Sequence, residues 1–258
     1  MQFEGSTILI TGGGSGIGRG LAEAFHKAGS KVIIAGRRKE LLDEVVAANP
    51  GMAAEAFDVD HAEAIKTFAT NLIAKYPALN AVMHNAGIMR DEDLKAGDPE
   101  TAEATIATNL LGPIRLNSAL LPHLLQQPSA TVLTVTSGLA YVPLSLTPTY
   151  CATKAAIHSY TQSLRYQLKD THVQVIEVVP PYVQTELTGE HQKSDPMAMP
   201  LDEYIQETVG ILRDQPDAVE VLVERVKPLR FAAENGNHAA VMTKLNEARI
   251  AGRAAAKP

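Results

Sequence analysis

The chain has 258 residues, and its hydrophobic share of 45% is ordinary for a globular protein. A net charge of −6 argues against nucleic acid as a partner, because nucleic-acid binding needs a basic surface. The single cysteine, Cys151, excludes an internal disulfide and favours a reducing compartment. We recognise neither a secretory leader nor an apolar run of the ~20 residues that a membrane helix needs. We therefore expect a cytoplasmic protein with no membrane partner, and the spacing of its Cys and His residues predicts no metal.

Short apolar segments alternate with segments of helical periodicity along the chain. Strands are expected at residues 7–11, 31–36, 53–59, 80–87, 130–137, 173–179 and 219–224. Helices are expected at residues 17–28, 39–48, 61–75, 101–127 and 150–169. Strands that are apolar throughout are typical of a parallel sheet covered on both faces, and the alternation indicates right-handed βαβ units. We expect a single α/β domain over residues 1–258, with a Rossmann-type doubly wound parallel sheet flanked by helices.

Two segments near the C-terminus differ from this pattern. Residues 186–200 are polar and contain two prolines, so we expect a mobile segment there, and a substrate lid within about residues 186–215. Residues 234–258 have helical spacing but few apolar positions, so this tail is expected to fray.

A glycine-rich turn, TGGGSGIG at residues 11–18, joins the first strand to the first helix. Glycines permit unusual backbone angles and close approach of a diphosphate, while the helix that follows offers unpaired N–H groups to the anion. A glycine turn without a ligand is the alternative, but the strand before it and the helix after it favour nucleotide binding. The residues expected to contact the nucleotide are Gly12, Gly14, Ser15, Gly16, Ile17 and Gly18.

The second expected strand ends in Arg37 and Arg38, where an NAD-binding protein usually carries an acid for the ribose hydroxyls. A guanidinium can instead meet a 2′-phosphate with two parallel N–H donors. The alternative is that both arginines simply begin a solvated helix. The missing acid and the paired arginines predict NADP(H) in preference to NAD(H).

Tyr150 and Lys154 are four residues apart in the segment YCATK, so they share one face if the segment is helical. A phenol beside a cation can act as a general acid or base, because the ammonium favours the phenolate and lowers the pKa of the phenol. Ser137 follows an expected strand and can donate a hydrogen bond to the reacting oxygen. Singly, each residue has a structural explanation: a packed aromatic, a solvated charge and a strand-end cap.

In their order along the chain, these motifs resemble those of the short-chain dehydrogenase/reductase family over about residues 5–190. The resemblance rests on TGGGSGIG, Asp58-Val59, Asn85-Ala86-Gly87, Asn109, Ser137 and YCATK. It implies that Asp58 and Val59 contact the adenine, and that Asn85, Ala86 and Gly87 line the cofactor groove. It also implies a catalytic set of Asn109, Ser137, Tyr150 and Lys154, in which Asn109 holds a water that relays protons to Lys154 and Lys154 also binds the nicotinamide ribose.

The resemblance further implies that residues after the sixth strand cover the nicotinamide: Pro180, then Val183 through its backbone, and Thr185 at the amide or a phosphate. Pro181 stands where the family usually has glycine. Because proline fixes φ and lacks an N–H, we expect a stiffer wall there with one donor fewer.

The expected substrate pocket is lined by Met89, Leu139, Ala140, Tyr141 and Tyr182. This lining is mostly apolar and has no evident cationic clamp, so the sequence predicts a small, neutral, fairly hydrophobic ketone or aldehyde and its alcohol, rather than an acid or a phosphorylated sugar. The resemblance also implies a homodimer or homotetramer built on the helices at 101–127 and 150–169. The predicted function is an NADP(H)-dependent carbonyl reductase, with an NAD-dependent dehydrogenase of a hydroxylated metabolite and a non-catalytic dinucleotide sensor as alternatives.

Overall fold

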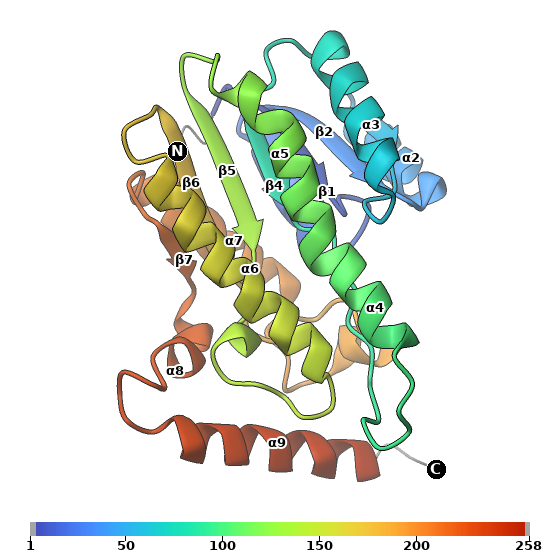
Figure 1. The fold of residues 1–258 in the computed structure, drawn as a ribbon, viewed down its shortest axis with the longest axis vertical. Coiled ribbons are helices and arrows are strands. Elements are labelled where there is room, and N and C mark those ends of the chain that lie inside the picture. The colour runs from blue at the N-terminus through green and yellow to red at the C-terminus, as the bar shows by residue number, and fades with distance from the viewer. Residues whose placement is uncertain (1–3, 256–258) are drawn as a thin grey trace.

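A computed structural model describes residues 4–255, with side chains through residue 252. Within these residues, seven strands form one parallel sheet in the order β3-β2-β1-β4-β5-β6-β7 (Figure 1). The strands are β1 (Thr7–Thr11), β2 (Lys31–Gly36), β3 (Ala53–Ala56), β4 (Ala81–His84), β5 (Ala130–Val135), β6 (Val173–Val179) and β7 (Glu220–Leu222). The doubly wound parallel sheet expected from the sequence is confirmed.

The strand order reverses between β1 and β4, which pair in parallel through Ile10 and Met83. Such a reversal opens a crevice beyond the carboxyl ends of the strands. Three expected strands are shorter than predicted at this edge and end at Ala56, His84 and Val135. The residues that follow them leave the sheet, because they form the walls of the crevice instead of pairing with a neighbouring strand.

Helices cover both faces of the sheet (Figure 1). They are α1 (Gly16–Lys27), α2 (Lys39–Ala48), α3 (Ala62–Lys75), α4 (Glu100–Ile106), α5 (Gly112–Leu124), α6 (Pro148–Gln167), α7 (Leu201–Asp214), α8 (Lys227–Arg230) and α9 (His238–Ala255). In the part of the chain that the structure describes, no helix is long and apolar enough to cross a membrane.

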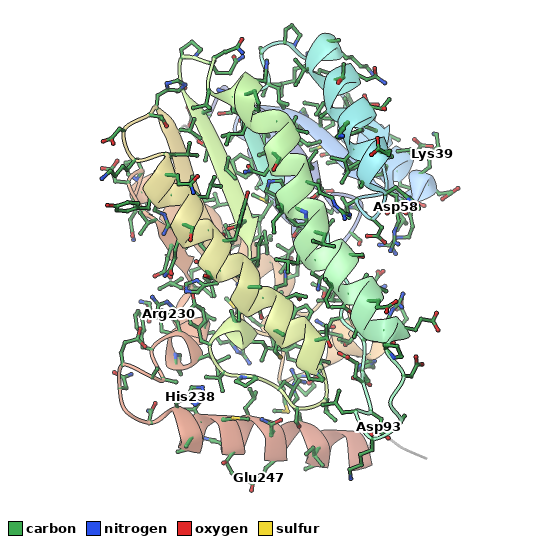
Figure 2. All side chains as sticks on the ribbon, in the orientation of Figure 1. Lys39, Asp58, Asp93, Arg230, His238 and Glu247 are labelled. Carbon is green, nitrogen blue, oxygen red and sulfur yellow. The ribbon has the colours of Figure 1, made fainter. Side chains whose placement is uncertain are left out.

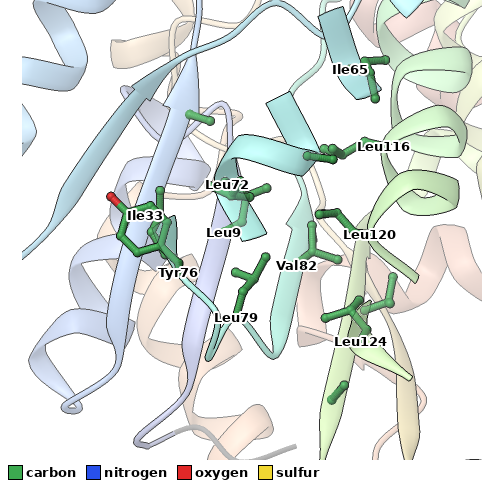
Figure 3. Close-up of a cluster of buried hydrophobic side chains, with 14 of the residues drawn as sticks. Leu9, Ile33, Ile65, Leu72, Tyr76, Leu79, Val82, Leu116, Leu120 and Leu124 are labelled. Carbon is green, nitrogen blue, oxygen red and sulfur yellow. The ribbon is translucent and has the colours of Figure 1, made fainter. Parts of the chain in front are cut away.

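The core has two parts, one on each face of the sheet. Leu9 of β1 points to one face, where Leu72, Leu116 and other side chains of α3, α5 and α6 pack (Figure 3). Its neighbours Ile8 and Ile10 point to the opposite face, where they meet α1, α2 and α7. Because successive side chains of a strand point to opposite faces, a strand covered on both sides is apolar at every position. This accounts for the uninterrupted apolar runs in the sequence.

The single helix expected at residues 101–127 is interrupted. α4 ends at Ile106, a π-helical turn follows at Ala107–Leu111, and α5 begins at Gly112. π-Helical turns are rare and occur mostly at functional sites. This one contains Asn109, a candidate catalytic residue.

The region expected to form a lid divides into two parts with different packing. Residues 186–200 contain only a short 3₁₀ helix, Glu190–Ser194, whereas α7 is part of the core. Tyr204 and Leu212 of α7 are each 1% exposed, and Ile205 lies against the α1 glycine Gly20. Only the segment before α7 therefore has the packing of a lid.

The C-terminal tail was expected to fray. In the described residues it contains one continuous helix, α9, over His238–Ala255. Figure 1 shows α9 running across the end of the domain toward which the arrow of β5 points. Asn246 holds it there, because its side-chain amide donates to Pro143 O at 3.1 Å and accepts from Ser145 N at 2.6 Å. Fraying was expected because the tail has few apolar residues. Hydrogen bonds such as those of Asn246 hold the helix instead of apolar packing.

Candidate active site

The glycine turn brings the end of β1 close to the end of β4. Gly12 and Gly16 have φ angles of +70° and +53°, a region that residues with side chains rarely adopt. A Cβ atom on Gly18 would lie 2.3 Å from Gly12 O and 2.4 Å from Asn85 Nδ2. The absence of side chains here is therefore a steric requirement.

Thr11 locks this turn to the β4 loop. Its hydroxyl donates to Met83 O at 3.3 Å and accepts from the backbone N–H groups of Asn85 and Ala86, each at 3.1 Å. Asn85 returns a hydrogen bond from Nδ2 to Thr11 O at 3.0 Å. The sequence analysis missed Thr11, although its place at the end of β1, directly before the glycines, could have indicated this role.

Both predicted arginines lie at the edge of the glycine turn. Arg38 donates from Nη2 to Ser15 Oγ at 2.8 Å, and Arg37 lies 3.5 Å from Asp60 through Nη1 and Oδ2. The Arg37 side chain is 52% exposed, so its guanidinium is free to meet an anion. Cations beside an anion-binding turn are the arrangement that a ribose 2′-phosphate requires.

A cleft of about 670 Å³ runs along the carboxyl ends of the strands. Its walls include most of the residues proposed from the sequence: Gly12, Gly14, Ser15, Gly16, Ile17, Gly18, Arg37, Arg38, Val59, Asn85, Ala86, Gly87, Met89, Ser137, Leu139, Tyr150, Lys154, Pro180, Pro181, Tyr182, Val183 and Thr185. Four others, Asp58, Asn109, Ala140 and Tyr141, do not line it.

Asp58, labelled in Figure 2, is turned toward its own loop. Its Oδ1 accepts from Asp60 N at 3.1 Å, a local turn that satisfies the carboxylate. Val59, the next residue, does line the cleft and is buried. Of the pair expected at the adenine, the structure therefore brings only the apolar member to the cleft wall.

Tyr150 and Lys154 lie one turn apart on α6 and are both only 6% exposed, as the four-residue spacing predicts. The Lys154 ammonium donates to Val135 O at 2.8 Å and lies 5.5 Å from the centre of the Tyr150 ring. Ser137 lies two residues after the end of β5, and its hydroxyl accepts from Leu139 N at 3.1 Å, which fixes the turn that carries it. Strand β5 and helix α6 thus place three polar groups at one end of the cleft.

Burial dominates the acidity of these groups. It raises the pKa of Tyr150, with hydrogen bonding to Ser137 opposing the rise. It also lowers the pKa of Lys154 to about 8. The expected lowering of the Tyr150 pKa by Lys154 is not found, because burial disfavours the phenolate and the hydrogen bond of the ammonium goes to the backbone. The phenol is therefore protonated at neutral pH.

Asn109 braces the β4 loop from the π-helical turn. Its amide donates to Ile88 O and accepts from Ile88 N, each at 2.9 Å, and Nδ2 lies 3.4 Å from Thr153 Oγ1. With 2% exposure and these partners, its side chain is committed to the protein. A water relay through Asn109 stays a prediction of the family resemblance.

The segment after β6 is held over the cleft by Gln192, which the sequence analysis missed. This side chain is 3% exposed, and its Nε2 donates to Val183 O at 2.7 Å and to Thr185 Oγ1 at 3.0 Å. The carbonyl of Pro180 accepts from Gly138 N at 2.9 Å, which joins this segment to the turn that carries Ser137. Glutamine in a polar lid segment gave no sequence signal of this burial.

Tyr141 is turned away from the substrate pocket, contrary to expectation. Its hydroxyl donates to Glu177 Oε1 at 3.1 Å and to Glu220 Oε1 at 3.3 Å, and it lies 3.1 Å from His158 Nδ1. Glu177 is fully buried, and a buried carboxylate needs such donors. This need explains why Tyr141 packs behind the site.

His158, Glu177 and Glu220 have ligand atoms within 4.8 Å of one another, a grouping that sequence spacing did not predict. Each is already engaged, since Glu177 also accepts from Thr136 Oγ1 at 2.7 Å and Glu220 receives two hydrogen bonds from Arg230, at 3.0 and 3.1 Å. His158 belongs to α6, Glu177 to β6 and Glu220 to β7, so the cluster links these three elements.

The fold and the cleft define a dinucleotide-binding oxidoreductase, and the comparisons with known proteins agree. Residues 6–196 match the family described as short chain dehydrogenase. The chain is 38% identical over 237 residues to an uncharacterized oxidoreductase of Bacillus subtilis, DltE. The alignment covers 90% of this chain and 93% of DltE. The chain therefore belongs to the short chain dehydrogenase family.

Solved structures of two bacterial proteins show the same fold. A short chain dehydrogenase from Burkholderia cenocepacia in complex with NADP is 28% identical, with a TM-score of 0.79 over 94% of this chain and 99% of that one. Another, from Burkholderia phymatum in complex with NAD, is 18% identical, with a TM-score of 0.78 over 91% and 95%. Relatives of this fold thus hold either dinucleotide.

The residues of the cleft fit a nicotinamide dinucleotide. The glycine turn leaves the first N–H groups of α1 available to a diphosphate. Gly16 faces Thr185 of the covering segment, since a Cβ atom on Gly16 would lie 3.3 Å from the Thr185 side chain. Tyr150, Lys154 and Ser137 lie at the opposite end of the same cleft. Such a cofactor would supply a hydride at that end.

Proposed function

We propose that the protein is an NADPH-dependent reductase that converts a ketone or aldehyde to an alcohol. The observation that carries this proposal is Tyr150, a buried phenol that is protonated in neutral solution and lines the cleft together with Ser137 and Lys154. Reduction of a carbonyl needs a proton donor in that state, since the oxygen gains charge as hydride arrives at the carbon.

The residues have separate roles in the proposed reaction. A dihydronicotinamide bound in the cleft would supply the hydride for the carbonyl carbon, and the π pair of the C=O bond would then go to oxygen. Tyr150 gives its proton to that oxygen, so the products are the alcohol and NADP⁺. Ser137 donates a hydrogen bond to the same oxygen. Lys154, with a pKa of about 8, is mostly charged at neutral pH and stabilises the phenolate until solvent reprotonates it.

Arg37 and Arg38 support NADPH over NADH in this proposal, because both line the cleft next to the glycine turn. Asp60, 3.5 Å from Arg37, supports the alternative, since an acid at that edge can receive ribose hydroxyls in an NAD-dependent dehydrogenase. A non-catalytic dinucleotide sensor is the less favoured alternative, as it would have no need of a buried Tyr–Lys pair.

The test is to follow absorbance at the nicotinamide band while the purified protein consumes NADPH, and then NADH, with a panel of ketones and aldehydes. Faster oxidation of NADPH is the expected result. Faster oxidation of NADH would support the dehydrogenase alternative. Tight dinucleotide binding without turnover of any panel member would support the sensor.

We also propose that the protein forms a homodimer or homotetramer through α4, α5 and α6. Ile106 and Leu111, on the outer side of the α4–α5 segment, are 39% and 36% exposed, and apolar side chains there favour burial against a second copy. Light scattering after size-exclusion chromatography measures the state directly, and a monomer at micromolar concentration would refute the proposal.

A further inference from the structure

Helix α9 closes the substrate end of the cleft. Leu245 packs against the cluster formed by Leu144, Tyr150 and Cys151, and it lines the cleft. The rotation of the helix is fixed, because Asn246 bonds the loop before α6 and His238 Nε2 lies 3.0 Å from Tyr141 O. Figure 2 shows His238 where α9 begins and Glu247 on the side facing away from the domain.

This docking brings a cation to the cleft. Arg249 follows Leu245 by one helical turn and also lines the cleft, with its side chain 20% exposed. The guanidinium lies over the Tyr182 ring, 3.4 Å from its centre, and 3.6 Å from Asp195 Oδ2. That oxygen already accepts from Tyr182 Oη at 2.9 Å. A guanidinium carries five N–H donors, so these contacts with Tyr182 and Asp195 leave donors that can meet an acceptor in the cleft.

A second arginine approaches the same region from the β4 loop. Arg90 follows Met89, which packs against the same cluster around Tyr150. Arg90 lines the cleft, is exposed, and forms no ion pair with any residue in the described part of the chain. Two cations from segments far apart in the sequence therefore line the same cleft as the proton donor.

Among the described residues, the acidic side chains that line the cleft do not pair with these arginines. Glu186 and Glu190 line it, and Lys193 pairs with both, at 2.6 and 3.0 Å. The expectation of a neutral substrate rested on a lining without cations, and Arg90 and Arg249 remove that premise.

We infer that Arg249, with Arg90, binds a carboxylate of the substrate, so that the substrate is an oxo acid whose carbonyl is reduced at Tyr150. A planar guanidinium matches a carboxylate with two parallel hydrogen bonds. Apolar side chains of the cleft, among them Leu139 and Leu144 beside Tyr150, suit the short hydrocarbon chain that would join the carboxylate to the carbonyl. The carboxylate is a spectator that orients the substrate. This inference rests on the proposed reductase function for the reaction but not for binding.

The kinetic test uses straight-chain oxo acids, with the keto group at successive positions, against their methyl esters. The wild type is compared with two variants, Arg249→Gln and Lys244→Gln. The second is the control, because it removes a charge from an exposed position of the same helix. We expect Arg249→Gln to raise KM for the best acid roughly 10- to 100-fold, the effect of one charged hydrogen-bonded contact, with kcat and the ester kinetics little changed. Lys244→Gln should behave as the wild type. Equal use of acids and esters, or an unchanged KM in Arg249→Gln, would overturn the inference while leaving the reductase function intact.

A binding test separates the inference from turnover. The melting temperature of the NADPH-loaded protein is measured with the same acids and with the matching hydroxy acids and amides. We expect carboxylates to raise it more than amides in the wild type and in Lys244→Gln, but not in Arg249→Gln. A carboxylate-specific shift without turnover would refute the reductase function alone. No shift with any carboxylate would overturn the inference.

Discussion

The cofactor half of the cleft and its substrate half are built in different ways. At the cofactor half, backbone atoms approach so closely that glycine is required, as the 2.3 Å gap at Gly18 shows. At the substrate half, side chains from distant segments meet, and Leu245 and Arg249 of the last helix, α9, complete the wall. The first kind of construction leaves a short motif in the sequence, whereas the second leaves none. Substitutions should therefore have steep effects in the first half and graded effects in the second.

The largest expected effect on stability is that of Gly18→Ala. Alanine usually stabilises a helix relative to glycine, but here its Cβ would meet Gly12 O at 2.3 Å. We expect the free energy of unfolding to fall by about 3 kcal/mol, as overpacking at a rigid backbone does. Gly210→Ala in α7 is the matched control, because no atom lies within 4 Å of its Cβ, and it should stabilise by up to ~1 kcal/mol. Urea unfolding measures both, and equal effects would break the comparison.

Lys154→Met tests the buried charge beside Tyr150. The folded pKa of about 8 lies below the ordinary 10.5, so between these values the unfolded chain binds more protons than the folded one. Stability of the wild type relative to Lys154→Met should therefore rise with pH from about 8 to about 10.5, by about 3 kcal/mol in total. Unfolding at a series of pH values shows this, and a flat difference would mean that Lys154 titrates normally.

Arg38→Gln tests the predicted preference for a 2′-phosphate. Loss of one charged contact should raise the Kd for NADPH roughly tenfold and leave that for NADH unchanged. Lys39→Gln is the control, since Lys39 pairs with Asp43 at 2.5 Å and does not line the cleft. Fluorescence titration of the reduced dinucleotides gives both constants. An equal weakening of the two would assign Arg38 to some other part of the cofactor.

The smallest effect is expected in the substrate half. Asn246→Ala removes the hydrogen bonds to Pro143 and Ser145, so the free energy of unfolding should fall by about 1 kcal/mol. Glu247→Gln, on the outer side of the helix, should change it by less than ~0.5 kcal/mol. If the two variants unfold alike, the amide of Asn246 does not hold α9 in place.

The sequence predicted the strands and most of the helices, because apolar periodicity reports burial directly. α2 begins and ends at the predicted residues, Lys39 and Ala48. It also predicted the Tyr150–Lys154 pair, because a four-residue spacing on a helix determines which side chains share a face. Both inferences depend only on residues that are close together in the sequence.

The sequence did not predict what depends on distant neighbours. Tyr141 turns toward Glu177 because that buried carboxylate needs donors, and no local pattern shows the two meeting. The pKa of Tyr150 rises because its burial outweighs the hydrogen bonding to Ser137, a balance that residue spacing cannot predict. The tail looked too polar to dock, yet polar contacts hold it. Arg249 was missed for the same reason.

The central claim, that a buried phenol at the closed end of a dinucleotide cleft gives up the proton, is tested most directly by Tyr150→Phe. The rate of NADPH oxidation with the best carbonyl substrate and the Kd for NADPH are measured on the same preparation. The account predicts a rate at least about a hundredfold lower, with the Kd within about twofold of the wild type. A variant that oxidises NADPH at the wild-type rate would contradict it.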